Sequence, residues 1–162
     1  MANGNGNSID VTMVNPFLAS ASEVFKQMFD CDLVKGQVTI KKDPSASNDV
    51  AIIIGISGDI YTGVVVYSMK SYTAKKMVTF LDASITNEKA KEFSDALGEV
   101  ANIVSGNAMA VFTAQGTRLN ITTPSVIIGE AFEIHLMDQT TLSTELQSPF
   151  GMLEINVAIK KL

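Results

Sequence analysis

Residues 94–107 combine side chains that can take part in chemistry with a regular helical spacing. The row, at intervals of four, three and four residues, consists of Asp95, Glu99, Asn102 and Gly106. At roughly 100° per residue, a helix places all four within about 60° of one another. An amide both donates and accepts hydrogen bonds, and a carboxylate accepts them or pairs with a cation. Such a face can orient a water molecule and hold a positively charged partner.

The opposite face of the same segment is apolar and predicts burial. It lies roughly 180° from the polar row and consists of Phe93, Leu97, Val100, Val104 and Ala108. Spacing alone favours an ordinary solvated surface for the polar row. Two features oppose that interpretation: Asn102 is a poor helix former, and Gly106 costs about 1 kcal/mol relative to alanine. Gly98 removes further bulk beside Glu99, so we expect another molecule to cover this face.

The composition indicates one folded domain and excludes several functions. The chain has 162 residues, of which 46% are hydrophobic and 18% charged, as in a globular protein. A formal net charge of −5 without a basic cluster argues against nucleic-acid binding. No apolar run reaches the roughly 18 residues of a membrane span, so membrane insertion is not expected. The single Cys31 fits a reducing compartment and predicts a cytoplasmic protein.

The chain divides into a short leader and one domain. Residues 1–13 lack the basic and apolar regions of a signal peptide, and we interpret them as a disordered leader before a single domain at 14–162. Helices are expected at 16–29, at 71–81, and from Thr86 or Asn87 to about Gln115, with Glu88 in the first turn of the last one. Strands are expected at 35–41, as a hairpin over 50–69 that turns at 57–59, and at 119–121, 125–128, 131–137 and 153–162.

The two halves of the sequence match weakly when shifted by 76 residues. Phe17 then falls on Phe93, and Glu23 falls on Glu99. Each half continues into strands, which predicts an α+β fold: a pseudo-symmetric helix-β-β-β repeat with an antiparallel-rich sheet packed against long helices. Lys26 matches Asn102 and Asp30 matches Gly106. The polar face therefore occurs once per chain.

Other catalytic patterns are absent from the sequence. His135 lies on the alternate face of the strand expected at 131–137, without a second histidine or cysteine beside it, and we interpret it as structural. There is no phosphate-binding loop, nucleophile elbow or zinc pattern. One histidine and one cysteine almost exclude an ordinary catalytic triad.

The row Asp95-x-x-x-Glu99-x-x-Asn102-x-x-x-Gly106 resembles the signature of the CheC, CheX and FliY family of bacterial chemotaxis phosphatases. The sequence around this row is LGEVANIVSGNAMA, and it is followed by NITTPSVIIGE. The earlier stretch IGISGDIYTGVVVYSM looks like the family's first hairpin. The similarity covers roughly residues 16–160. CheC-like members usually carry the motif in both halves, so the sequence is more similar to the CheX type and implies a CheC/CheX-like fold.

This resemblance implies a protein substrate, the phosphorylated aspartate of a CheY-like response regulator in chemotaxis or another two-component system. By analogy, Glu99 reaches the regulator's active-site lysine and Asn102 orients the attacking water. Mg²⁺ belongs to the regulator, so the chain needs no cofactor or metal of its own. Gly98 and Gly106 give the partner clearance, and Asp95 is either a rim contact or a docking residue. The resemblance also implies a homodimer, formed by pairing of sheet edges.

The residue types fit this chemistry independently of the resemblance. An acyl phosphate is already activated, so its hydrolysis mainly requires a positioned water. A neutral amide suits that task, while a carboxylate one turn away suits pairing with a cation. Two alternatives remain open: a non-catalytic adaptor or scaffold that binds a signalling protein through the same face, and a module outside chemotaxis that acts on another receiver domain. The amide at Asn102 favours catalysis, because docking alone does not require it.

Overall fold

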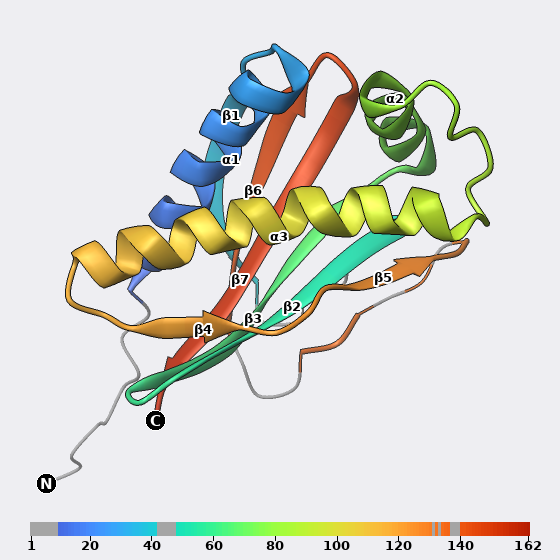
Figure 1. The fold of residues 1–162 in the computed structure, drawn as a ribbon. Coiled ribbons are helices and arrows are strands. Elements are labelled where there is room, and N and C mark those ends of the chain that lie inside the picture. Colours follow the sequence, from blue (N-terminus) through green and yellow to red (C-terminus); the bar gives the residue numbers. More distant parts are fainter. Residues whose placement is uncertain (1–9, 42–47, 131, 133, 137–139) are drawn as a thin grey trace, which may run out of the picture.

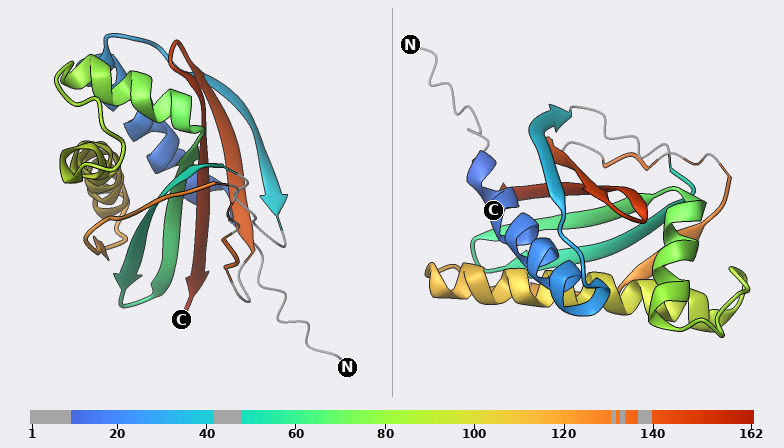
Figure 2. Two further views of the ribbon diagram at one scale, coloured as in Figure 1. Left: turned by 90° about the vertical axis from the view of Figure 1, so that its right-hand side faces the viewer. Right: turned by 90° about the horizontal axis from the view of Figure 1, so that it is seen from above.

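The computed structural model describes residues 10–41, 48–130, 132, 134–136 and 140–162. In these residues, three α-helices cover one face of a seven-stranded sheet whose strand pairs are all antiparallel. Figure 1 and the left panel of Figure 2 show the helices on a single side of the twisted sheet. The α+β class predicted from the sequence is confirmed. Among the described residues, no helix combines the length and apolar composition needed to cross a membrane.

The first two helices lie where the sequence predicts them. α1 spans Asn15–Phe29, with Pro16 in its first turn, and α2 spans Ser71–Leu81. α1 ends because Asp30 adopts the left-handed conformation, with φ of 49°. A short 3-10 helix, η1, at Val11–Val14 precedes α1 and is capped by the Asp10 carboxylate, which accepts from Thr12 N at 2.9 Å. Part of the predicted leader, residues 11–13, is thus helical, and residues 1–9 lie outside the described part.

The third helix, α3, spans Lys91–Ala114 and begins later than predicted. Asn87 does not cap it. Its side chain accepts from Lys89 N at 3.0 Å in a turn before the helix. The Glu88 carboxylate lies 2.8 Å from Lys75 Nζ and accepts from Ser71 Oγ at 2.8 Å, both on α2. Glu88 therefore lies before α3 and contacts α2, whereas the sequence predicted it in the first turn of α3.

The strands follow the order β1-β6-β7-β3-β2-β4, and β5 also pairs with β2. Their bounds are β1 Val34–Lys41, β2 Val50–Gly58, β3 Tyr61–Met69, β4 Leu119–Ile121, β5 Ser125–Ile128, β6 Thr141–Ser148 and β7 Gly151–Lys161. The predicted β2–β3 hairpin lies inside the sheet, between β7 and the β4–β5 edge.

Two features of the strand prediction are wrong. The described residues of 131–137, which are 132 and 134–136, form no strand, so exposed His135 is not on a sheet face. β6 was not predicted, because its sequence TLSTELQS is mostly polar. It is nevertheless buried, with Thr141, Ser143 and Thr144 at most 2% exposed. Its position between β1 and β7 explains this burial.

The described structure contains the predicted repeat. α1 leads into β1, β2 and β3, and α3 leads into β4, β5, β6 and β7, with β4 and β5 together in the place of one edge strand. The helices are offset by 76 residues, since α1 begins at Asn15 and α3 at Lys91. The hairpins are offset by 90, since β3 begins at Tyr61 and β7 at Gly151. The single shift found in the sequence therefore fits the helices only.

A continuous apolar core holds α3 on the sheet. All five residues of its predicted apolar stripe are at most 6% exposed, and burial of each large side chain contributes about 1.5–3 kcal/mol. Phe112 packs edge-on against Phe17 of α1, with ring centroids 5.9 Å apart. Tyr67 Oη of β3 and Ser105 Oγ of α3 share a buried hydrogen bond of 2.7 Å. Burial raises the pKa of the Tyr67 phenol, so this bond persists at physiological pH. These contacts fix the rotation of α3, and with it the direction of its polar face.

Candidate functional site

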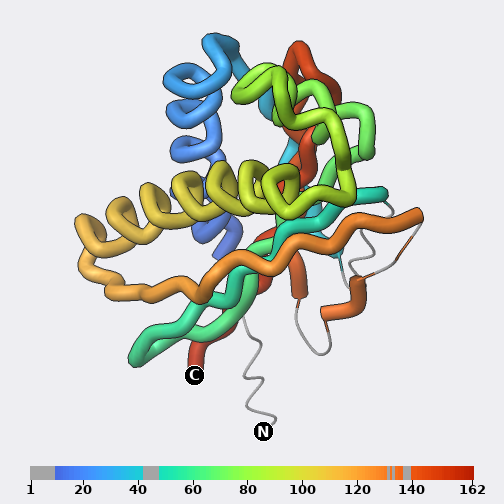
Figure 3. The backbone as a smooth tube through the Cα atoms, turned by 45° about the vertical axis from the view of Figure 1, so that its right-hand side comes forward, coloured from blue at the N-terminus to red at the C-terminus, as the bar shows by residue number. Residues whose placement is uncertain are grey.

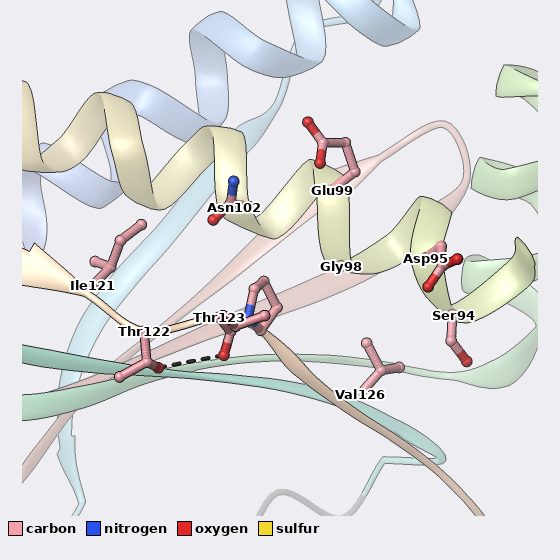
Figure 4. A pocket seen from close by; sticks show the side chains of 10 residues that line it. Ser94, Asp95, Gly98, Glu99, Asn102, Ile121, Thr122, Thr123 and Val126 are labelled. Atoms are coloured by element: carbon pink, nitrogen blue, oxygen red, sulfur yellow. Dashed lines mark hydrogen bonds between the residues drawn. The ribbon is translucent and has the colours of Figure 1, made fainter. Parts of the chain in front are cut away.

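The polar row of α3 faces away from the core, as the sequence predicts. Asp95, Glu99 and Gly106 are exposed and Asn102 is partly exposed. Figure 4 shows the side chains of Glu99 and Asn102 one turn apart on α3, beside the chain segment that joins β4 to β5. Figure 3 shows that this segment runs alongside α3. The row therefore lies next to a second wall.

An open groove separates α3 from β4 and β5. It encloses about 650 Å³. One wall comes from α3 and the other from the 121–126 segment; the lining residues are Ser94, Asp95, Gly98, Glu99, Asn102, Ile121, Thr122, Thr123, Pro124 and Val126. The sequence analysis predicted four of the five α3 residues but gave no function to the second wall. Pro124, which interrupts an otherwise β-branched stretch, was the available signal, since proline cannot donate to a sheet ladder.

Gly98 is buried against this second wall, and Gly106 is not. A Cβ on Gly98 would lie 3.6 Å from Val126 Cγ2 and 3.7 Å from Pro124 Cβ, which is ordinary contact. A Cβ on Gly106 would meet nothing within 4 Å. The space between Gly98 and the second wall would thus hold one methyl group, while Gly106 leaves open space on the outside of the helix.

The two carboxylates of the row have different surroundings. Asp95 Oδ2 lies 2.8 Å from Lys91 Nζ, one turn earlier on α3, and this hydrogen bond raises the pKa of Lys91. The pair is exposed and stabilises the fold little. Within the described residues, neither Glu99 nor Asn102 has a hydrogen bond or an ion pair through its side chain. Glu99 is therefore the uncompensated anion of the groove, and the Asn102 amide keeps its full hydrogen-bonding capacity.

The matching face of α1 is arranged differently. Glu23 Oε1 accepts from Gln27 Nε2 at 3.2 Å, and Lys26 Nζ lies 3.3 Å from Asp32 Oδ1. The side chains at the positions of Glu99 and Asn102 are therefore engaged with neighbours on their own surface. The structure places the free carboxylate and amide in one half only.

The described residues hold no group of three or more histidine, cysteine, aspartate or glutamate side chains that could bind a metal ion. Cys31 is partly buried, and desolvation raises the pKa of its thiol. The site is instead a helix, α3, that presents one carboxylate and one amide at the side of a groove. It can orient a small polar molecule next to a reacting centre that a second macromolecule supplies.

The fold, with its two helix-and-strand halves, is similar to that of CheX and CheC-like proteins of known structure. The model of the family described as chemotaxis phosphatase CheX matches residues 50–147, and the chain belongs to this family. The CheX-type assignment made from the sequence is confirmed. The class of enzyme, a phosphatase among the hydrolases, is confirmed with it.

Three similar proteins illustrate the relationship. The CheY-P phosphatase CheX of Thermotoga maritima is 25% identical over 127 residues, which are 78% of this chain and 81% of that protein. A chemotaxis protein CheX from Desulfovibrio desulfuricans has a TM-score of 0.83 and 25% identity, covering 91% of this chain and 99% of its own. The CheX of a CheX–CheY–BeF₃–Mg²⁺ complex from Borrelia burgdorferi has a TM-score of 0.78 and 26% identity, covering 93% of this chain and 99% of its own.

Proposed function

We propose that this chain hydrolyses the aspartyl phosphate of a CheY-like response regulator and that Glu99 and Asn102 of α3 enter the regulator's active site. Membership of the CheX family supports the reaction. The relative from Thermotoga maritima is named for CheY-P, and the similar structure from Borrelia burgdorferi contains CheY with BeF₃ and Mg²⁺. The observation that carries the proposal is the groove in which Glu99 and Asn102 lie one turn apart with unpaired side chains.

In the proposed reaction, the oxygen of a water molecule attacks phosphorus and the bond between phosphorus and the aspartyl oxygen breaks. The aspartate leaves as a carboxylate, and the products are inorganic phosphate and a proton. Asn102 accepts a hydrogen bond from the water and donates to an oxygen near the phosphoryl group, which holds the attack in line. A neutral amide does this without repelling the phosphoryl oxygens.

Glu99 has a separate role in the proposal. Its carboxylate would repel a phosphoryl group, so it pairs with a cation of the regulator, the active-site lysine, and fixes the register of the two proteins. Mg²⁺ is held by the regulator and supplies charge neutralisation there, and the chain contributes no cofactor or metal of its own. Gly106 leaves the outer side of α3 clear for the partner. Asp95, already paired with Lys91, forms the rim of the contact.

The test is the rate of phosphate loss from a phosphorylated CheY-like receiver of the same genome. Asn102→Ala should reduce the acceleration on the order of 10²-fold, because water positioning is lost while the docking face remains. Asn107→Ala is the matched control, since Asn107 lies on the same helix but does not line the groove. Unchanged turnover in Asn102→Ala would remove Asn102 from the mechanism.

The adaptor alternative predicts a different result in the same experiment. An adaptor binds the receiver through α3 but leaves its phosphate lifetime unchanged in every variant. If the wild-type chain accelerates no receiver of the chemotaxis pathway, receivers of other two-component systems from the same genome are the next substrates to measure.

We further propose a cytoplasmic homodimer that forms by strand pairing through β1. β1 is the edge strand of the first half and pairs only with β6 among the described strands. Two of its apolar side chains are exposed, Val38 at 38% and Ile40 at 53%. An exposed strand edge with apolar side chains is a site for pairing with another chain.

A further inference from the structure

The second wall of the groove is a break in a strand, and the break occurs only in the half that carries Glu99 and Asn102. β4 pairs with β2 up to Ile121, and β5 resumes pairing at Ser125. In the other half, β1 occupies the corresponding edge and pairs with β6 along its length, with one register shift between Lys35 and Val38. Pro124 lies in the break, and its missing N–H prevents continuous pairing there.

One residue of the break, Thr122, satisfies both backbone groups of Gly55 in β2. Thr122 Oγ1 accepts from Gly55 N at 2.8 Å, and Thr122 N donates to Gly55 O at 3.0 Å. The hydroxyl also donates to Thr123 O at 3.3 Å, drawn as the dashed line in Figure 4. We call this set of three bonds the Thr122–Gly55 clamp. Within it, the bond from Gly55 N to Thr122 Oγ1 takes the place of a backbone ladder bond between β2 and the segment.

Gly55 makes room for the clamp. A Cβ at residue 55 would lie 3.0 Å from Thr122 Cγ2 and 3.2 Å from Thr122 Oγ1, so a side chain there would push Thr122 away from β2. On the other side of the segment, a Cβ added to Gly98 of α3 would lie 3.7 Å from Pro124 Cβ and 3.6 Å from Val126 Cγ2. The second wall therefore lies between β2 and α3, with a glycine facing it on each side. Its distance from Asn102 depends on where the clamp holds the segment.

We infer that Thr122 is a positioning residue of the phosphatase: the Thr122–Gly55 clamp sets the width of the groove and so the depth to which the phosphorylated loop of the regulator reaches Asn102. This inference rests on the proposed function. Thr122 does not act on the reacting atoms, because its hydroxyl is already engaged with two backbone groups. A displaced wall changes the alignment of water and phosphorus, to which the rate is more sensitive than the affinity is.

The test compares Thr122→Val, which keeps the shape of the side chain but loses the hydroxyl, with Thr122→Ser, which keeps the hydroxyl. In the full chain, Thr122→Val should lower kcat about tenfold and leave KM within about twofold. Thr122→Ser should restore most of kcat, and Thr79→Val, at an exposed position of α2 that does not line the groove, should match the wild type. Full kcat in Thr122→Val, or equal losses in the valine and serine variants, would overturn the inference.

A second measurement separates failure of this inference from failure of the proposed function. Hydrogen exchange of the Gly55 amide, followed by NMR on the chain alone, should be faster in Thr122→Val and unchanged in Thr122→Ser. If the wild type is active and the valine variant exchanges faster but keeps full kcat, the clamp exists without positioning and only the inference fails. If the wild type accelerates no receiver, the proposed function fails, and with it the catalytic part of the inference.

Discussion

The two halves of the molecule share an architecture but differ in what their helices offer. On α1, the side chains at the positions that match Glu99 and Asn102 are engaged, Glu23 with Gln27 and Lys26 with Asp32. On α3, the corresponding Glu99 and Asn102 are unpaired and face a groove. A repeated scaffold places a helix in the same position twice. The proposed catalysis additionally requires side chains without partners on the helix and a second wall that forms a groove beside it.

The two edges of the sheet also differ, because one is a continuous strand and the other is interrupted. β1 is a single strand of eight residues at one edge, with apolar side chains exposed. The other edge is divided into β4 and β5 and runs alongside α3, where it forms the groove. In the proposed function, the first edge pairs with a second copy of the chain, and the other edge receives the response regulator beside α3.

The strongest test of this comparison transfers the motif to the first half. In an Asn102→Ala background, the changes Ala19→Asp, Lys26→Asn and Asp30→Gly complete the row on α1. We expect phosphate release to stay on the order of 10²-fold below the wild type, because β1 lacks the break that forms the groove. Thermal unfolding should confirm that the variant is folded, since glycine suits the positive φ at residue 30. Recovery of activity would show that the helix face alone suffices.

An effect of intermediate size, on the affinity for the receiver, is expected when the Glu99 carboxylate is removed but not when the matching Glu23 carboxylate is removed. Glu99→Ala should weaken binding to a BeF₃-activated receiver about tenfold, or about 1.4 kcal/mol, because an ion pair with the partner is lost. Glu23→Ala should leave the dissociation constant unchanged. Titration calorimetry at two salt concentrations measures both, and the difference should shrink at high salt. Equal affinities of wild type and Glu99→Ala would exclude Glu99 from docking.

The smallest effect on the reaction is expected at the β1 edge. Ile40→Lys should convert a dimer to a monomer, because a charge replaces an apolar side chain in the pairing surface, with the rate per chain unchanged. Ile127→Lys is the matched control, since Ile127 is exposed to 41% on β5 at the opposite edge. Analytical ultracentrifugation measures the mass. A monomeric wild type at micromolar concentration would contradict the dimer.

Local pattern was enough to predict the parts of the fold that depend on periodicity. The helical spacing of apolar residues predicted α1, α2 and the buried stripe of α3, and β-branched residues predicted the hairpin of β2 and β3. β6 was missed because burial there comes from neighbouring strands and not from apolar composition. The start of α3 was misplaced because Glu88 bonds to α2, which no local rule describes.

The sequence by itself determined that Asp95, Glu99, Asn102 and Gly106 share one face of a helix, because helical geometry depends only on spacing. It also determined that the face occurs once, since Lys26 and Asp30 occupy the matching positions. Only the tertiary structure decided that Glu99 and Asn102 are unpaired and face a groove. The second wall of that groove depends on a contact between Gly55 and Thr122, 67 residues apart in the chain. Such a contact follows from strand register and sheet order, which local sequence does not specify.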